Sequence, residues 1–203
     1  MNSLLEQLEI EATPKCAAPF DPDFRPAALW VRAYRKRLGA DRRKVTIALQ
    51  RPDGMVFHHL MEVLPDTPEN AAANYRYVER TVKYLLWQKG ANTVLVAGCP
   101  EIAAKLAVAY APGGEREFDA DFMGRLVFLA PFVVKAVEES EIPAANEPKF
   151  RMGNCWKGCR IGFDLGGSDR KCAAVIDGQI VHTEEVPWAP IKETDWHYQR
   201  DGI

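Results

Sequence analysis

The alternation of hydrophobic and polar positions predicts a β-hairpin in the first third of the chain. Apolar side chains alternate with small or polar ones over 45–49, and a second apolar run covers 56–63. The sequence Pro52-Asp53-Gly54 between these runs is typical of a tight turn. Two short runs joined in this way predict a pair of antiparallel strands.

Helical spacing of apolar residues predicts one helix before the hairpin and two after it. The longer of these helices has Pro68 at its first position and ends before Gly90. Residues 1–26 contain a short amphipathic turn followed by four prolines, which favour an extended arm. Around the hairpin, the expected elements are a helix over 27–38, a helix over 67–89, a strand over 92–97, a helix over 99–111 and a strand over 126–137 that Pro131 interrupts. We therefore expect residues 1–140 to form a mixed α/β domain.

The pattern changes after this domain. Residues 141–157 are polar and contain proline, so we expect a linker there. Three strands are then predicted over 159–164, 171–176 and 179–186, with Asp177-Gly178 as the hairpin turn between the last two. The remaining residues are polar and rich in proline, and we expect them to find nothing to pack against. Three strands rarely bury enough surface to stand alone, so residues 158–203 are expected to be the incomplete start of a second domain.

Composition excludes several classes of protein. The chain has 203 residues, of which 47% are hydrophobic and 27% charged, as in ordinary globular domains. Its net charge of −2 gives no general attraction to nucleic acid or to an acidic membrane. Mean hydropathy is −0.24, and we see neither a membrane-spanning run nor a signal peptide, so a cytoplasmic location is expected. The odd number of cysteines, five, favours reduced thiols over disulfides or a zinc site.

The strongest candidate for chemistry is the glycine turn between the first two of the late strands. The first strand ends in Asp164, and the turn Gly166-Gly167-Ser168 follows it. Glycines let the backbone approach closely and direct several N–H groups to one spot, which suits an anion, and Ser168 adds a hydroxyl donor. Asp164 can hold a hydrated Mg²⁺, and Lys171 can neutralise a phosphate, although Arg170 is equally available by spacing.

This turn differs from the two common phosphate-binding motifs, because both of those lead into a helix and this one leads into a strand. The stretch IGFDLGGSDRKCAAVIDGQIV instead resembles the opening β-hairpin of the actin-like (RNase H-like) ATPase superfamily. It is most similar to the ROK-type sugar kinases, which include bacterial glucokinases. Phe163 stands where that family usually has an aliphatic residue, and Ser168 where it more often has threonine. The resemblance covers only residues 158–186.

The resemblance implies ATP-dependent phosphorylation of a sugar hydroxyl. It places Asp164, Gly166, Gly167, Ser168 and Lys171 near the phosphates of ATP, with Mg²⁺ at Asp164. The family's catalytic aspartate, second phosphate loop, adenosine site and zinc motif all follow this hairpin, so the resemblance implies no catalytic residue within these 203 residues. We therefore expect the N-terminal part of a longer kinase, inactive alone, whose partners are a nucleotide and a sugar. A homodimer is a further possible partner state that the sequence does not decide.

Two other hypotheses remain. The chain is alternatively a non-catalytic α/β module for binding or assembly, in which the late strands complete the sheet of the first domain. The run over 32–44 carries seven basic residues and one acidic residue, which suggests a DNA-binding regulator. That last hypothesis is less favoured, because the hairpin begins at Val45 and leaves no room for two adjacent short helices. A regulator would need Arg35, Lys36, Arg37, Arg42 and Arg43 on one face.

Overall fold

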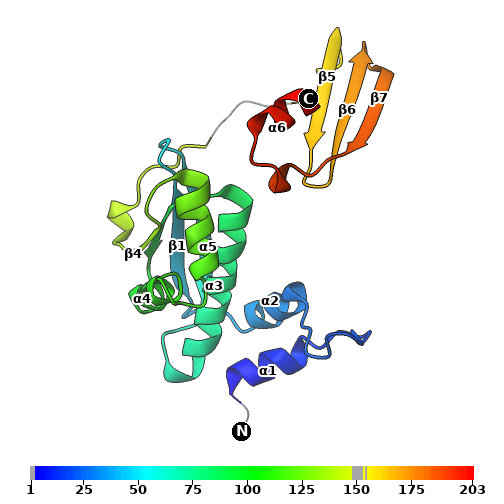
Figure 1. The fold of residues 1–203 in the computed structure, drawn as a ribbon. Coiled ribbons are helices and arrows are strands. Elements are labelled where there is room, and N and C mark those ends of the chain that lie inside the picture. The colour runs from blue at the N-terminus through cyan, green and yellow to red at the C-terminus, as the bar shows by residue number, and fades with distance from the viewer. Residues whose placement is uncertain (1–2, 148–152, 154) are drawn as a thin grey trace. The chain divides into compact units, whose positions relative to one another are not determined.

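The computed structural model describes residues 3–147, 153 and 155–203, and the chain divides into two compact units, residues 1–148 and 149–203 (Figure 1). Both units contain strands, and helices accompany each sheet. The chain is thus a mixed α/β protein with two separate sheets.

The first unit contains a four-stranded sheet in the order β2-β1-β3-β4. Strand β1 lies between β2 and β3 and pairs antiparallel with both, while β3 and β4 are parallel. Because β2 and β3 run in the same direction, α3 connects them by crossing over β1. The expected hairpin is present, and the strands and the connecting helix are β1 (Arg43–Gln50), β2 (Val56–Val63), α3 (Pro68–Lys89), β3 (Thr93–Ala97) and β4 (Val133–Ala136).

Local chemistry accounts for one helix start and one helix end in this unit. Ser3 caps the first helix, since its hydroxyl accepts from the N–H of Glu6 and the Glu6 carboxylate accepts from the N–H of Ser3. Gly90 ends α3 with a φ of 72°, a conformation that glycine adopts without strain. The remaining helices of this unit are α1 (Leu4–Glu11), α2 (Ala27–Arg35), α4 (Pro100–Ala109) and α5 (Glu117–Asp121).

One face of the four-stranded sheet forms the main hydrophobic core. Alternate residues of β1, namely Val45, Ile47 and Leu49, are almost completely buried on this face. They belong to one cluster with Val82 and Leu86 of α3 and with side chains of the other helices. In Figure 1, α3 lies along the sheet over β1. Removing this much apolar surface from water is the main source of stability for a unit of this size.

Residues 137–147, which we call the strap, pack against the opposite face and the outer edge of the sheet. Val137 and Ile142 contact a small cluster formed by Ala48, Val56 and Leu95. The hydroxyl of Thr46 donates to Glu139 Oε1 at 2.8 Å, and Asn146 pairs with Val56 through two backbone hydrogen bonds. Residues 141–147, which the sequence placed in a linker, therefore belong to the first unit.

The segment over 126–137 differs from the single interrupted strand that the sequence predicted. Residues Phe122–Phe128 form a π-helix, and Leu129 then adopts a left-handed conformation with φ of 51°. Gly124 makes this turn possible, because its carbonyl accepts from the N–H of Ala130, and a Cβ on Gly124 would lie 2.9 Å from the carbonyl oxygen of Ala130. Within this segment only Val133–Ala136 form a strand.

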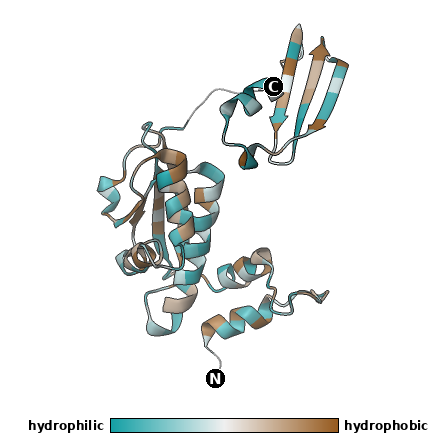
Figure 2. Cartoon of the chain, viewed as in Figure 1, coloured by the Kyte–Doolittle hydropathy of each residue, from teal (hydrophilic) through white to brown (hydrophobic). Residues whose placement is uncertain are grey.

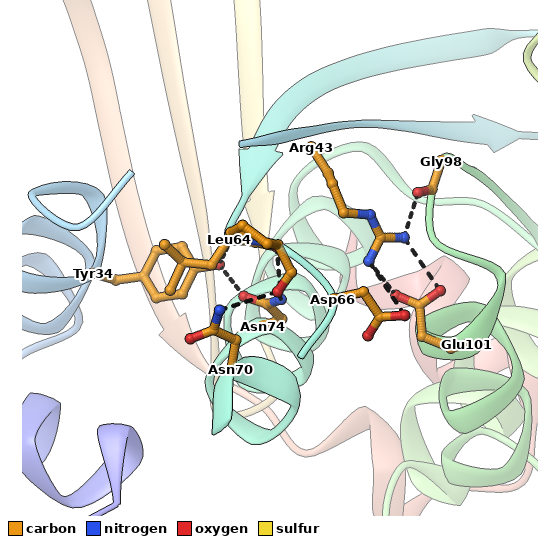
Figure 3. A network of polar contacts seen from close by, with 9 residues as sticks. Tyr34, Arg43, Leu64, Asp66, Asn70, Asn74, Gly98 and Glu101 are labelled. Atoms are coloured by element: carbon orange, nitrogen blue, oxygen red, sulfur yellow. Dashed lines mark hydrogen bonds and ion pairs between the residues drawn. The ribbon is translucent and has the colours of Figure 1, made fainter. Parts of the chain in front are cut away.

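A buried network of polar groups connects β2, α2 and α3 (Figure 3). The Tyr34 hydroxyl donates to Asn74 Oδ1 at 2.5 Å and accepts from the N–H of Leu64 at 3.0 Å. Asn74 Nδ2 in turn donates to the Leu64 carbonyl at 2.9 Å. Each of these groups is satisfied without water, so the network fixes the end of β2 against the two helices. Figure 3 also shows Arg43 beside Glu101 and the Gly98 carbonyl.

The second unit is a three-stranded antiparallel meander in the order β5-β6-β7, followed by two short helices. No residue that the structure describes between 153 and 203 is buried. Ile161, Phe163 and Leu165 lie on one face of β5 and are 66%, 51% and 46% exposed. Figure 2 shows hydrophobic positions on these strands. The elements of the second unit are β5 (Cys159–Leu165), β6 (Asp169–Ile176), β7 (Gln179–Pro187), the 3₁₀ turn Pro190–Lys192 and α6 (Trp196–Gly202).

Over the described ranges 3–147, 153 and 155–203, no helix is long and apolar enough to cross a membrane.

Candidate functional site

The glycine turn predicted from the sequence connects β5 to β6 in the second unit. The N–H of Gly166 donates to the carbonyl of Asp169 at 2.9 Å and closes the turn. Gly167 and Ser168 at its tip are exposed. The turn is therefore short, anchored at its base and open to a ligand.

The two glycines have different roles. A Cβ on Gly166 would lie 3.0 Å from the Asp169 carbonyl oxygen and 3.2 Å from Asp169 Oδ1. A Cβ on Gly167 would meet only Ile191 Cδ1, at an ordinary 3.8 Å. A side chain at Gly166 would therefore crowd the base of the turn, whereas one at Gly167 would fit without a clash.

Three donors at the tip have no partner among the residues that the structure describes: the N–H of Gly167, the N–H of Ser168 and the hydroxyl of Ser168. Successive backbone N–H groups in a turn form a concave site for anions. The tip therefore presents three unused donors to an acceptor from solution.

A tryptophan outside the predicted motif fixes the turn from the other side. Trp188 Nε1 donates to the Gly166 carbonyl at 2.6 Å, and its backbone N–H donates to the Ser168 carbonyl at 3.0 Å. Its ring stacks on Tyr198 of α6 with centroids 6.3 Å apart. The expectation that the polar C-terminal segment packs against nothing is therefore wrong. The sequence signal for this packing is the presence of Trp188 and Tyr198 in that segment, because large aromatic rings favour an apolar surface.

Asp164 and Lys171 lie directly opposite one another on β5 and β6, and Glu185 of β7 is opposite Lys171. Lys171 Nζ lies 3.4 Å from Asp169 Oδ1 and 3.6 Å from Glu185 Oε1. The hydrogen bond to Asp169 is the main cause that raises the pKa of Lys171, and the charges of Asp169 and Glu185 add to it. Lys171 is therefore fully charged at neutral pH but already paired with carboxylates.

Arg170 is on the other face of β6, beside Glu184 at 3.8 Å. The structure thus brings Asp164 and Lys171 together and separates Arg170 from them, because successive side chains of a strand alternate between faces.

A hollow of about 490 Å³ beside the Asp164 face is lined by Gly162, Asp164, Lys171, Thr183 and Glu185, among others. Asp169 and Glu185 are the members of this site that sequence analysis missed.

The Asp164 carboxylate has no hydrogen bond or ion pair within the part of the chain that the structure describes. Its negative charge acts on Lys171 across the strand pair, and a carboxylate is a suitable outer ligand for a hydrated Mg²⁺. The described ranges contain no group of three or more His, Cys, Asp or Glu side chains that could hold a metal ion.

The structure also bears on the two alternative hypotheses. The late strands form a sheet of their own and do not complete the sheet of the first unit, so that part of the module hypothesis is wrong. In the basic run, three arginines contact carboxylates on different elements: Arg37 pairs with Glu11, Arg42 with Glu62 and Arg43 with Glu101. These pairs remove much of the charge that a DNA backbone would need.

No family model, curated protein or solved structure matches this chain.

Proposed function

We propose that this chain is the N-terminal part of an ROK-like, glucokinase-related sugar kinase, and that its second unit contributes the first phosphate-binding turn for Mg-ATP. The observation that carries the proposal is the exposed turn between β5 and β6, with its unused N–H groups at Gly167 and Ser168. The resemblance of residues 158–186 to that family supplies the reaction.

In this proposal each residue of the turn has one task. The N–H groups of Gly167 and Ser168 and the Ser168 hydroxyl donate to oxygens of the terminal phosphates. Asp164 holds Mg²⁺ through its water shell, and Gly166 keeps the turn tight. Lys171 supports phosphate binding only by exchanging its contacts with Asp169 and Glu185, so its contribution is smaller than its charge suggests.

We assign no catalytic base to any of these 203 residues. Phosphoryl transfer needs a positioned nucleophile in addition to a phosphate site and a metal. We therefore expect no sugar phosphorylation by these 203 residues alone. A cytoplasmic location and a homodimer stay predictions.

The phosphate site is tested by titrating the chain with Mg-ATP while recording backbone amide shifts by NMR. At about 10 mM nucleotide, we expect shifts centred on Gly167 and Ser168. Ser168→Ala should weaken this binding several-fold, because a charge-assisted hydrogen bond is lost, whereas the exposed Ser140→Ala in the first unit serves as the matched control. Unchanged amides at the turn, or equal effects of the two variants, would overturn the phosphate site.

The kinase itself is tested by the intact mass of the native protein in its source cells. The proposal requires a mass well above the 22.8 kDa of this chain, and sugar phosphorylation by that longer protein. A native mass of 22.8 kDa would reject the kinase and leave a binding module.

A further inference from the structure

A second cavity, of about 370 Å³, lies in the first unit and is independent of the glycine turn. It is bordered by α2, α3, β2 and the residues just before α2. Trp30 and Tyr77 form its buried floor, and each is about 95% covered, with 5% and 4% exposed. A cavity of this volume is in the range of small-molecule sites.

The floor is rigid because its aromatic rings are packed on one another. The Trp30 and Tyr34 rings stack with centroids 5.5 Å apart, and the centroids of Tyr34 and Tyr77 are 4.5 Å apart. Tyr34 is in turn held by its hydrogen bonds to Asn74 and Leu64. The cavity is therefore formed before any ligand arrives, which lowers the cost of binding.

Four arginines line this cavity: Arg25, Arg35, Arg76 and Arg80. Only Arg76 has a close carboxylate of its own, Glu9 Oε1 at 2.8 Å. Arg80 Nε is 3.7 Å from Glu79, but that carboxylate is held more tightly by Arg116 at 2.5 Å. Arg25 and Arg35 have no ion pair with any residue that the structure describes. The cavity thus carries positive charge that the protein does not balance.

The guanidiniums are positioned by contacts that leave donors free. Arg35 Nε donates to the Tyr77 hydroxyl at 2.8 Å, which uses one of its five N–H groups. Arg76 lies over the Trp30 ring at 5.4 Å. The remaining N–H groups of a planar guanidinium match the oxygens of a phosphate in pairs, more closely than a lysine ammonium would.

An exposed ring completes the lining. Arg76, Arg80 and Tyr84 are spaced four residues apart along α3, so they share one face of the helix. Tyr84 lines the cavity and is 62% exposed, so its ring is free to stack. His59 on β2 also lines the site, and burial and the charge of Arg35 lower its pKa, so it is neutral at pH 7 and adds hydrogen bonding without charge.

The charge, the volume and the free ring select a class of ligand. We propose that this cavity binds a small phosphorylated molecule that carries a planar ring, of the size of a nucleoside monophosphate. Arg35 and Arg80 bind the phosphate, and Tyr84 stacks on the ring. The proposal does not depend on the kinase proposal, since the site lies wholly in the first unit.

The test is binding of AMP, ribose 5-phosphate and adenosine to the full chain, measured by calorimetry and mapped by NMR. We expect AMP to shift amides around Arg35 and Arg80, and to bind more tightly than either of the other two compounds. Arg35→Gln should weaken AMP about tenfold, whereas Arg32→Gln, on the same helix and outside the cavity, should change it less than about twofold. Arg80→Gln, a second exposed variant, should match Arg35→Gln.

A further variant separates phosphate from ring recognition. Tyr84→Ala should bring the affinity for AMP down to that for ribose 5-phosphate and leave ribose 5-phosphate unchanged. The proposal is overturned if AMP shifts only the amides of the glycine turn, if adenosine binds as tightly as AMP, or if Arg32→Gln and Arg35→Gln have equal effects. The last result would mean that AMP responds to general charge and not to this cavity.

Discussion

The two units of this chain contain strands of similar apolar character but differ in what they bury. Ile47 on β1 is completely buried, whereas Ile161 on β5 is 66% exposed. The first unit has helices on one face of its sheet and the strap on the other, so its apolar residues find partners within the unit. Among the described residues of the second unit none is buried. Hydrophobic patterning predicts strands in both units, but only the presence of covering elements makes a core.

The largest expected effect comes from shortening the same side chain in each unit. Ile47→Ala should lower the free energy of unfolding by about 2–5 kcal/mol, because it leaves a cavity in a packed core. Ile161→Ala should change it by less than about 0.5 kcal/mol, because that side chain is already in water. Urea denaturation, monitored by circular dichroism, measures the loss in each variant. An equal loss in the two variants would mean that the apolar face of β5 is covered in solution.

The next effect concerns a backbone position in the first unit. Gly98 has a φ of 88°, and a Cβ there would overlap the carbonyl oxygen of Lys44. Gly98→Ala should therefore cost about 2–4 kcal/mol, from strain and from displacement of β1. Gly54→Ala is the matched control, since its φ of 85° carries the same strain but its Cβ would meet nothing within 4 Å. The difference between their denaturation midpoints isolates the overlap, and equal midpoints would show that no overlap exists.

A smaller effect is expected from the buried polar network. Tyr34→Phe leaves the N–H of Leu64 and Oδ1 of Asn74 without partners, which should cost about 1–3 kcal/mol. Tyr84→Phe, which changes an exposed hydroxyl, should cost less than about 0.5 kcal/mol. Thermal unfolding of both variants measures this difference. Equal unfolding temperatures would mean that the network does not stabilise the first unit.

The last prediction compares thiols and involves no change in sequence. Burial, aided by the charge of Glu101, raises the pKa of Cys99 to about 12, so at pH 8 only about one molecule in ten thousand carries its thiolate. Iodoacetamide should label Cys16, Cys155 and Cys159, which are exposed, and leave Cys99 unmodified by mass spectrometry. Because the unfolded thiol ionises near pH 9.0 and the folded one near 12, stability should fall as pH rises above 9.0. Rapid labelling of native Cys99 would contradict its burial.

Sequence analysis predicted the hairpin of the first unit and the meander of the second, because strand alternation and turn residues are local signals. It did not predict the π-helix at Phe122–Phe128, where a run of apolar residues is equally compatible with a strand. Nor could it place the strap, whose contacts with Thr46 and Val56 join segments far apart in the chain.

For the glycine turn, the sequence identified the residues at the tip but not their surroundings. Counting back from the Asp177-Gly178 turn would place Glu184 opposite Lys171. An irregularity in the pairing at Ala174 and Val175 shifts the register by one residue and places Glu185 there instead. Either register places a glutamate opposite Lys171. Since no residue type marks this bulge, the structure was needed to show that this glutamate is Glu185.

The strap also has a consequence for how this protein folds while it is being synthesised. Val56, at the start of β2, pairs with Asn146 of the strap, and Asn146 Nδ2 also donates to the Gly54 carbonyl across 92 positions of sequence. A ribosome adds about 5–20 residues per second, so the outer edge of β2 waits for roughly 5–20 s before the segment that covers it has been synthesised. During that interval the start of β2 lacks its backbone partner, and an unpaired strand edge can pair with another chain.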